Sequence, residues 1–132
     1  MTKLTDAMKT LIAENQCFVA TANKQGIPDV GPKKSTRALD DETIIFNEGT
    51  GKRTFSNIKE NPIVAIAVVN KERTEGFRFF GHAGIVTSGP IFEKAKEMAA
   101  QLNRPAPLAV IAVKVEEIYN LKPGPTAGER IA

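Results

Sequence analysis

Hydrophobic and polar positions change their spacing several times along the first half of the chain, and each change predicts an element. Residues 4–15 carry apolar side chains at helical spacing, which predicts a short amphipathic helix. The run CFVATA (17–22) predicts a strand, NKQG (23–26) supplies a turn, and TIIFN (43–47) predicts another strand. Between them, IPDVGPKKSTRAL (27–39) predicts an irregular strand at an edge or bulge, because its first half holds prolines and a glycine.

The second half of the chain alternates between apolar runs and charged segments. A short helix with Phe55 and Ile58 on one face should end before Pro62, because a residue that precedes proline disfavours helix. The further predicted elements are a buried strand (63–69), a charged loop (70–75), a long strand (76–88), a helix (89–102) and a final strand (107–121).

The predicted order is helix, three strands, short helix, two strands, helix and strand. Strands joined by tight turns argue against alternating βαβ units and favour a small, mainly antiparallel barrel whose helices cover its ends or gaps. We therefore expect one mainly β (α+β) domain over residues 1–121. The last segment, KPGPTAGERIA (122–132), is expected to be a loosely ordered tail unless a partner holds it.

Composition places the chain among soluble globular proteins, since 42% of its 132 residues are hydrophobic and 25% are charged. The sequence has no apolar run approaching about 18 residues, and its N-terminal segment carries scattered charges unlike a signal peptide. A cytoplasmic protein without membrane association is therefore expected. Cys17 is the only cysteine, which excludes an intrachain disulfide and a cysteine metal cluster.

The charge balance argues for a small ligand more than for a nucleic acid. A net charge of +3 is too weak to indicate nucleic-acid binding without a concentrated patch, and aromatic residues (6%) are too few for base-stacking platforms. We expect no nucleic-acid partner, and salt-sensitive binding of an oligonucleotide would show the opposite. A modest cationic surplus suits a small anionic ligand better.

One cationic cluster lies in EGTGKRTFSNIKENP (48–62), where two glycines precede Lys52, Arg53 and Thr54 at the start of the short helix. The stretch is not a Walker A loop, because Phe46 and Arg53 occupy required positions, and it lacks the third glycine of the dinucleotide fingerprint. Each cation at a helix start destabilises the helix by about 0.3–1 kcal/mol through its interaction with the helix dipole, unless an anion lies between the cation and the backbone. Two interpretations stay open for the stretch alone: a glycine turn with solvated charges, or a phosphate site.

A second cationic segment, GPKKST (31–36), lies on the strand that is expected to pair with residues 43–47. That hairpin would bring Lys33, Lys34 and their neighbours close to the loop that follows Asn47. Four cations and three hydroxyls would then converge, and like charges do not gather without a counterion. A phosphate is the simplest group to satisfy them, because arginine binds it in a bidentate manner and lysine as a point charge.

Taken together, these segments resemble the flavin-binding split barrels related to pyridoxamine 5'-phosphate oxidase, especially the small single-domain FMN-binding proteins. The resemblance spans nearly the whole chain: the amphipathic first helix and the segments FVATANKQGIPDVGP, DDETIIFNEGTGKRTFSNIKENPIVAIAVV, FRFFGHAGI and GPIFEKAKEM. It implies a six-stranded antiparallel split β-barrel with flanking helices, and a homodimer with two FMN molecules at the subunit interface.

The resemblance also implies which residues contact FMN. The second strand would line the edge of the isoalloxazine ring, the loop after the third strand would follow the ring and ribityl chain, and the short helix would begin at the phosphate. These groups are Gly31, Pro32, Lys33, Lys34 and Ser35; Asn47, Glu48, Gly49 and Thr50; and Lys52, Arg53 and Thr54. Pro32 and the lysine pair depart from the family pattern. A pattern for binding pyridoxal phosphate is not identifiable, so synthesis of that cofactor is not expected.

Bound FMN would supply the hydride or electron chemistry, while the protein sets geometry and electrostatics. Lys33 or Lys34 near the N1/C2 carbonyl end of the ring would stabilise its anionic reduced form. His82 is interpreted as a packed or hydrogen-bonded structural residue rather than a substrate-facing group, and Cys17 as part of the core. No catalytic acid or base is assigned.

Three functions remain open. The chain could be an FMN-dependent oxidoreductase or electron carrier for a small molecule, or a non-catalytic flavin-binding protein with the same site. The third alternative is a relative that uses deazaflavin F420 or haem, both of which occur on this fold.

Overall fold

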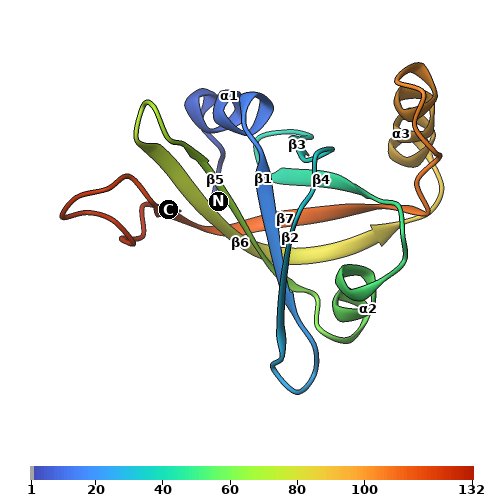
Figure 1. Cartoon of the computed structure of the whole chain (residues 1–132), viewed down its shortest axis with the longest axis horizontal. Coiled ribbons are helices and arrows are strands. Elements are labelled where there is room, and N and C mark those ends of the chain that lie inside the picture. Colours follow the sequence, from blue (N-terminus) through green and yellow to red (C-terminus); the bar gives the residue numbers. More distant parts are fainter. Residues whose placement is uncertain (1) are drawn as a thin grey trace.

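A computed structural model describes residues 2–132 as one curled antiparallel sheet with three helices (Figure 1). The elements in chain order are α1 (Asp6–Glu14), β1 (Cys17–Ala22), β2 (Pro28–Pro32), β3 (Arg37–Ala38), β4 (Thr43–Glu48), α2 (Arg53–Glu60), β5 (Ile63–Asn70), β6 (Glu75–Val86), α3 (Pro90–Gln101) and β7 (Ala109–Asn120). The strands lie in the order β2-β1-β5-β6-β7-β4-β3. No helix in this described part of the chain is long and apolar enough to span a membrane.

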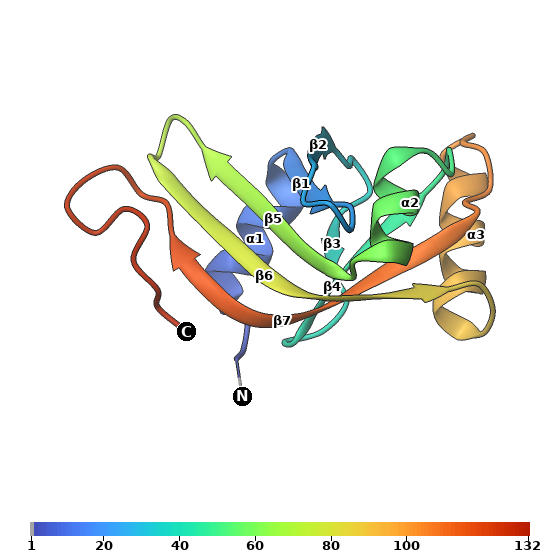
Figure 2. The same cartoon turned by 90° about the horizontal axis from the view of Figure 1, so that it is seen from below.

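The long strands β6 and β7 form the curved centre of the sheet (Figure 2). Their antiparallel register shifts between Phe80 and Gly81, which is a β-bulge. A bulge bends the strand that contains it. The two strands approach so closely at this bend that a Cβ atom added to Gly81 would lie 2.0 Å from the carbonyl oxygen of Lys114. Any side chain larger than that of glycine would therefore push the strands apart.

The predicted fold class is confirmed, with seven strands where six were expected. The irregular strand predicted over 27–39 divides into β2, which pairs with β1, and β3, which pairs with β4 at the opposite edge of the sheet. Pro32 has no N–H to extend the ladder, and a turn follows in which the Thr36 N–H donates to the Lys33 carbonyl oxygen at 3.1 Å. Residues 33–36, called the bridging segment below, thus cross the seam between the two sheet edges.

The main hydrophobic core lies between the inner face of the sheet and the helices α1 and α2. Its largest fully buried side chains include Phe46, Phe79, Leu11, Ile12, Ile44, Ile66, Ile111 and Ile118. Full burial of one such side chain contributes about 1.5–3 kcal/mol. This cluster therefore supplies much of the stabilisation that holds α1 against the sheet.

Helix α3 stands at the far end of the sheet from α1 (Figure 1). It packs through the fully buried Ala95 against Ile45 and Val110. The helix was predicted correctly, but its apolar face is only partly covered, because Met98 and Leu102 remain 37% and 58% exposed.

The C-terminal segment 122–132 is exposed and forms no helix or strand, but it is hydrogen-bonded to the sheet. The Ile118 N–H donates to the Ala132 carbonyl oxygen at 2.9 Å, and the Ile131 N–H donates to the Ile118 carbonyl oxygen at 2.8 Å. Pairing of β7 with β4 ends at Lys114. The returning tail therefore satisfies backbone groups on the part of β7 that β4 leaves unpaired.

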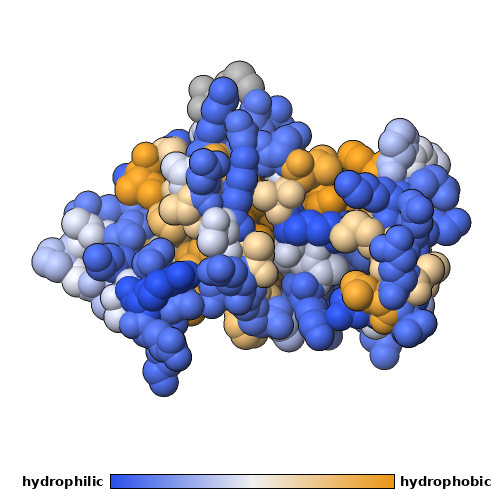
Figure 3. Space-filling view, turned by 90° about the horizontal axis from the view of Figure 1, so that it is seen from above, coloured by the Kyte–Doolittle hydropathy of each residue, from blue (hydrophilic) through white to orange (hydrophobic). Residues whose placement is uncertain are grey.

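Hydrophobic side chains also reach the surface. Figure 3 shows them as separate patches among hydrophilic residues on the face that it presents. The large exposed hydrophobic residues are Phe18, Ile27, Val30, Leu39, Ile63, Val69, Ile85, Met98, Leu102, Leu108 and Ile131. Single exposed hydrophobic residues are common, so only contiguous groups of them carry meaning.

Candidate functional site

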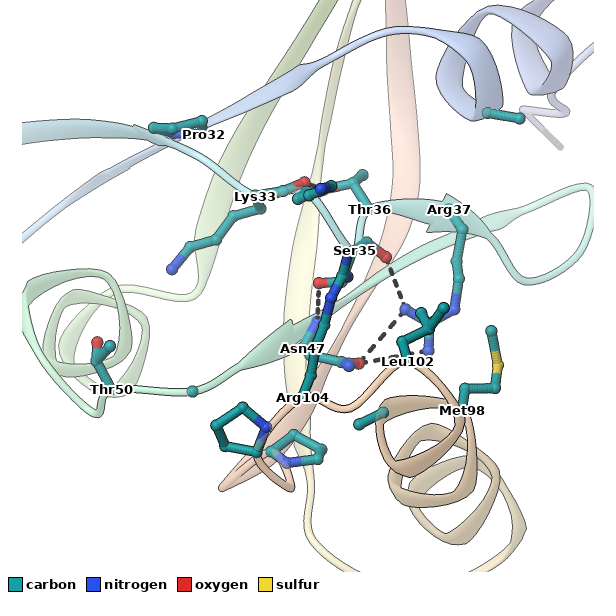
Figure 4. Close-up of a pocket in the computed structure, with 16 residues that line it drawn as sticks. Pro32, Lys33, Ser35, Thr36, Arg37, Asn47, Thr50, Met98, Leu102 and Arg104 are labelled. Carbon is teal, nitrogen blue, oxygen red and sulfur yellow. Dashed lines mark hydrogen bonds between the residues drawn. The ribbon is translucent and has the colours of Figure 1, made fainter.

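The bridging segment is tied to the end of β4 by polar groups, as Figure 4 shows. The backbone N–H of Asn47 donates to Ser35 Oγ at 2.8 Å. Arg37 Nη1 donates to the Ser35 carbonyl oxygen at 2.6 Å, and both Nη atoms lie 3.4 Å from Asn47 Oδ1. The bridging segment therefore lies against the end of β4.

A pocket of about 690 Å³ opens between the bridging segment, the end of β4 and the C-terminal end of α3 (Figure 4). Sites for small molecules and cofactors typically measure roughly 300–1,000 Å³. The predicted contact residues that line the pocket are Pro32, Lys33, Lys34, Ser35, Asn47, Gly49 and Thr50. Met98 and Leu102 contribute apolar lining from α3. The pocket thus combines an apolar wall with a polar wall.

Cationic side chains dominate the polar wall, namely Lys33, Lys34, Arg37 and Arg104. The hydrogen-bond acceptors of Arg37 are neutral, and within residues 2–132 no carboxylate lies at ion-pair distance from it. Burial lowers the pKa of the Arg37 guanidinium from its usual value, although an arginine remains protonated in proteins. Arg37 is therefore a cation of the pocket that has no carboxylate partner among residues 2–132.

Sequence reasoning missed Arg37 and Arg104. The signal for Arg37 was its place in the sequence, because it directly follows the cationic segment 31–36. Arg104 carried no such signal, since only the packing of α3 brings its loop to the pocket.

The predicted phosphate residues Lys52, Arg53 and Thr54 lie at the start of α2, shortly after Thr50, and do not line the pocket. Lys52 occupies the N-cap position without a capping hydrogen bond from its side chain, and the first turn contains no acidic residue. Gly51 allows this entry with a positive φ of 67°. The first backbone N–H groups of α2 thus lack a side-chain acceptor and are flanked by positive charge.

Two other predicted contact residues, Gly31 and Glu48, do not line the pocket. Gly31 lies within β2, opposite Val19 of β1. Glu48 is 1% exposed, and its Oε1 lies 3.4 Å from Lys33 Nζ. The structure therefore places Glu48 behind Lys33 rather than in the cavity.

His82 and Cys17 lie outside the pocket lining. His82 forms a hydrogen bond with the Glu116 carboxylate on the exposed surface of β6 and β7, so it is hydrogen-bonded but not packed in the core. Cys17 is 1% exposed, and burial raises the pKa of its thiol to about 11. The thiol is protonated at neutral pH and belongs to the core, as predicted.

Proteins of similar sequence share the whole fold. The chain is 44% identical to HupZ of Group A Streptococcus, with a TM-score of 0.86 over 95% of this chain and 99% of that chain. The uncharacterized protein MJ0282 of Methanocaldococcus jannaschii is 33% identical over 133 residues, which cover 98% of this chain and 89% of that protein. A Lactobacillus delbrueckii protein of known structure is 27% identical, with a TM-score of 0.77 over 90% of this chain and 95% of that chain.

More distant solved structures share the fold alone. An FMN-binding protein from Syntrophomonas wolfei is 17% identical, with a TM-score of 0.76 over 89% of this chain and 85% of that chain. An F420 reductase is 21% identical, with a TM-score of 0.67 over 87% of this chain and 98% of that chain. The heme storage protein HutZ from Vibrio cholerae is 18% identical, with a TM-score of 0.65 over 89% of this chain and 94% of that chain.

The sequence also matches a known protein family. The family model for pyridoxamine 5'-phosphate oxidase matches residues 4–122, which is nearly the whole chain. The resemblance noted from the sequence is therefore confirmed, and the chain belongs to the pyridoxamine 5'-phosphate oxidase family.

Proposed function

We propose that this protein binds FMN and acts as an oxidoreductase or electron carrier for a small molecule. The observation that carries the proposal is the pocket at the seam, whose cations include Arg37, a half-buried residue without a carboxylate partner in the described chain. Such a pocket suits a ligand that combines a flat apolar ring with an anionic tail. FMN is a ligand of that shape, and an FMN-binding protein shares the fold.

The residues divide into two roles toward FMN. Lys52, Arg53 and Thr54 would hold the phosphate together with the free N–H groups of α2, because a helix start favours an anion. Residues 32–35, 47, 49 and 50 would lie along the ring and ribityl chain, beside the apolar wall from α3. The flavin would supply hydride or electron transfer, and the chain would orient it and exclude water.

The residues that line the pocket make haem a weaker candidate for the ligand than FMN. Haem iron is usually held by histidine, cysteine, methionine or tyrosine. Met98 is the one residue of these types that lines the described pocket, and it is 37% exposed on α3. F420 shares the flat ring and phosphate of FMN, so geometry alone favours neither of these two ligands.

The absorbance spectrum of the purified protein tests the proposal, followed by mass identification of any released ligand. We expect a yellow protein with the spectrum of FMN, or a colourless protein that takes up FMN at one molecule per chain. A protein that rejects FMN but retains F420 or haem would refute it. Reduction of bound FMN by NAD(P)H, with turnover on an added acceptor, would separate an oxidoreductase from a non-catalytic flavin carrier.

Arg53→Ala should weaken FMN binding by more than tenfold, which corresponds to about 1.4 kcal/mol. The variant removes a cation beside the free N–H groups at the start of α2. Fluorescence titration of the ligand-free protein with FMN measures the effect. Lys59→Ala is the matched control, because it removes a cation from the last turn of the same helix and should leave the affinity unchanged. Unchanged affinity in Arg53→Ala would remove Arg53 from the phosphate role.

We further propose that the protein is a homodimer, with FMN at the interface and the outer face of the sheet as the contact. Strand register places a row of small and apolar side chains on this face: Phe18, Ala20, Val30, Ile63, Ala65 and Phe80. Arg78 lies beside them, with its guanidinium carbon 5.4 Å from the Phe80 ring centroid and 5.0 Å from that of Tyr119. Its Nε is buried without an acceptor.

A second copy of this chain fits the face by charge. Glu117 lies opposite Phe80 in the β6–β7 register, where it accepts from the Tyr119 hydroxyl at 2.6 Å and lies 3.9 Å from Arg130 Nη1. A two-fold axis that brings it to Arg78 of the other protomer would add a second arginine to this carboxylate. Tyrosine and arginine anchors surrounded by apolar contacts are typical of interface centres. The face therefore offers both the apolar area and the complementary charges of a self-associating surface.

Ala65→Glu should convert the dimer into a monomer, because it places a long charged side chain where the apolar face would meet the second copy. Sedimentation velocity measures the mass, and circular dichroism checks the fold. Gln25→Glu is the control, since it adds the same charge to an exposed turn. A monomeric parent protein would contradict the proposed dimer, and a dimeric Ala65→Glu variant would contradict this choice of face.

A further inference from the structure

Glu48 and Lys33 form a largely buried ion pair at the edge of the pocket. Glu48 Oε1 lies 3.4 Å from Lys33 Nζ, and the two side chains are 1% and 19% exposed. Glu48 Oε2 is buried without a hydrogen-bond partner. A buried charge is costly unless it is paired, so the Lys33 ammonium is the group that keeps the Glu48 carboxylate in its place.

Lys33 is held at several points along its length. Its backbone N–H donates to the Cys17 carbonyl oxygen at 3.1 Å, and its own carbonyl oxygen accepts from Thr36 Oγ1 at 2.7 Å. The ammonium lies 5.9 Å from the Phe46 ring centroid. Figure 4 shows the side chain extending from the bridging segment toward the side where Thr50 lies, away from Met98 and Leu102. The backbone contacts fix the position of the residue, and the contacts with Glu48 and Phe46 restrain its ammonium, whereas a free lysine samples many rotamers.

Lys34 differs from its neighbour in each respect. It is exposed, and among the described residues it has no ion-pair partner. Both lysines line the pocket, so position in the sequence does not distinguish them. The ion pair with Glu48 distinguishes them, because it restrains the Lys33 ammonium and leaves the Lys34 ammonium free to move.

We infer that Glu48 is a positioning residue, which fixes the Lys33 ammonium as the cation that tunes the redox potential of the bound flavin. This inference rests on the proposed binding of FMN. The ion pair is neutral overall, so removal of either member leaves a net charge beside the ligand. A positive charge stabilises the more negative reduced flavin, and a negative charge destabilises it. Glu48 and Lys33 should therefore act on the potential with opposite signs.

The midpoint potential of FMN bound to four variants tests the inference. Glu48→Gln should raise the potential, Lys33→Met should lower it, and the double variant should return close to the parent value. Lys34→Met is the matched control, because it removes the same charge one residue away and should shift the potential by less than half as much. A purely structural role would not give opposite signs. Shifts of the same sign, no shift in Glu48→Gln, or equal shifts in Lys33→Met and Lys34→Met would overturn the inference.

Acetylation of the ligand-free protein tests the positioning without FMN. Peptide mapping by mass spectrometry would follow the modification rate of Lys33, with Lys34 as the internal reference. Glu48→Gln should raise the Lys33 rate more than threefold and leave the Lys34 rate unchanged. Equal rates for the two lysines in the parent protein would overturn the positioning. Failure of the parent protein to bind FMN would instead overturn the proposed function and the redox role, while the acetylation result would still decide the pairing.

Discussion

Gly81→Ala should lower the free energy of unfolding by more than about 3 kcal/mol, since a methyl group forced into a closely packed site strains the backbone around it. The new Cβ would lie 2.0 Å from the carbonyl oxygen and 2.8 Å from the carbonyl carbon of Lys114. Both are backbone atoms of the central strand β7, so no flexible side chain can move aside. Relief requires separation of β6 and β7 at the bulge. Urea denaturation followed by circular dichroism measures the loss.

Gly84→Ala is the control for this effect. It lies in the same strand, but the nearest atom to an added Cβ is the Ala112 carbonyl oxygen at 3.9 Å, which is ordinary van der Waals contact. We expect a change of less than about 1 kcal/mol. Similar losses in the two variants would show that glycine matters at both positions for a reason other than the close approach at the bulge.

Phe46→Ala should lower the free energy of unfolding by about 3–5 kcal/mol, the usual effect of truncating a buried phenylalanine. The Phe46 side chain is 0% exposed and belongs to the main core. It also directly precedes Asn47, and its ring lies 5.9 Å from Lys33 Nζ. Denaturation measures the stability, and FMN titration well below the unfolding temperature measures the effect on the site.

Phe46→Leu separates the two consequences of that change. Leucine retains most of the buried apolar area, so we expect a loss of about 1–2 kcal/mol. It removes the aromatic face near Lys33 as fully as alanine does. Weakened FMN binding in both variants would assign the effect to the ring, whereas weakening only in Phe46→Ala would assign it to the cavity.

Most of the fold could be predicted from the sequence because its elements are strongly periodic. The apolar runs of β1, β4 and β5, and the helical spacing of α1, are local properties of the chain. The division of residues 27–39 into β2 and β3 is not local, because it depends on which sheet edge each half meets. The path of residues 122–132 is not local either, because backbone hydrogen bonds to β7 set it, and these leave no pattern in the side chains.

The candidate site was predictable where one connection joins its parts. The bridging segment and the end of β4 flank a single hairpin, so their proximity follows from sequence order. Arg104 and the apolar wall from α3 depend on packing between distant segments, which spacing cannot reveal. Glu48 was predicted to contact the ligand together with its neighbours in the sequence. Its neighbours in the sequence line the pocket, but the alternation of side chains along β4 turns its carboxylate inward.

The bridging segment has a consequence for how the protein withstands heat. No ladder of backbone hydrogen bonds joins β2 to β3, so a short turn and a few polar contacts fasten the barrel along this line. A ligand bound there would link the two edges of the sheet. At a concentration one hundred times its Kd, such a ligand would raise the free energy of unfolding by about 2.7 kcal/mol. The ligand-bound and ligand-free protein would therefore unfold at different temperatures. The fraction of the protein that stays folded when a lysate is heated would report the fraction with bound ligand.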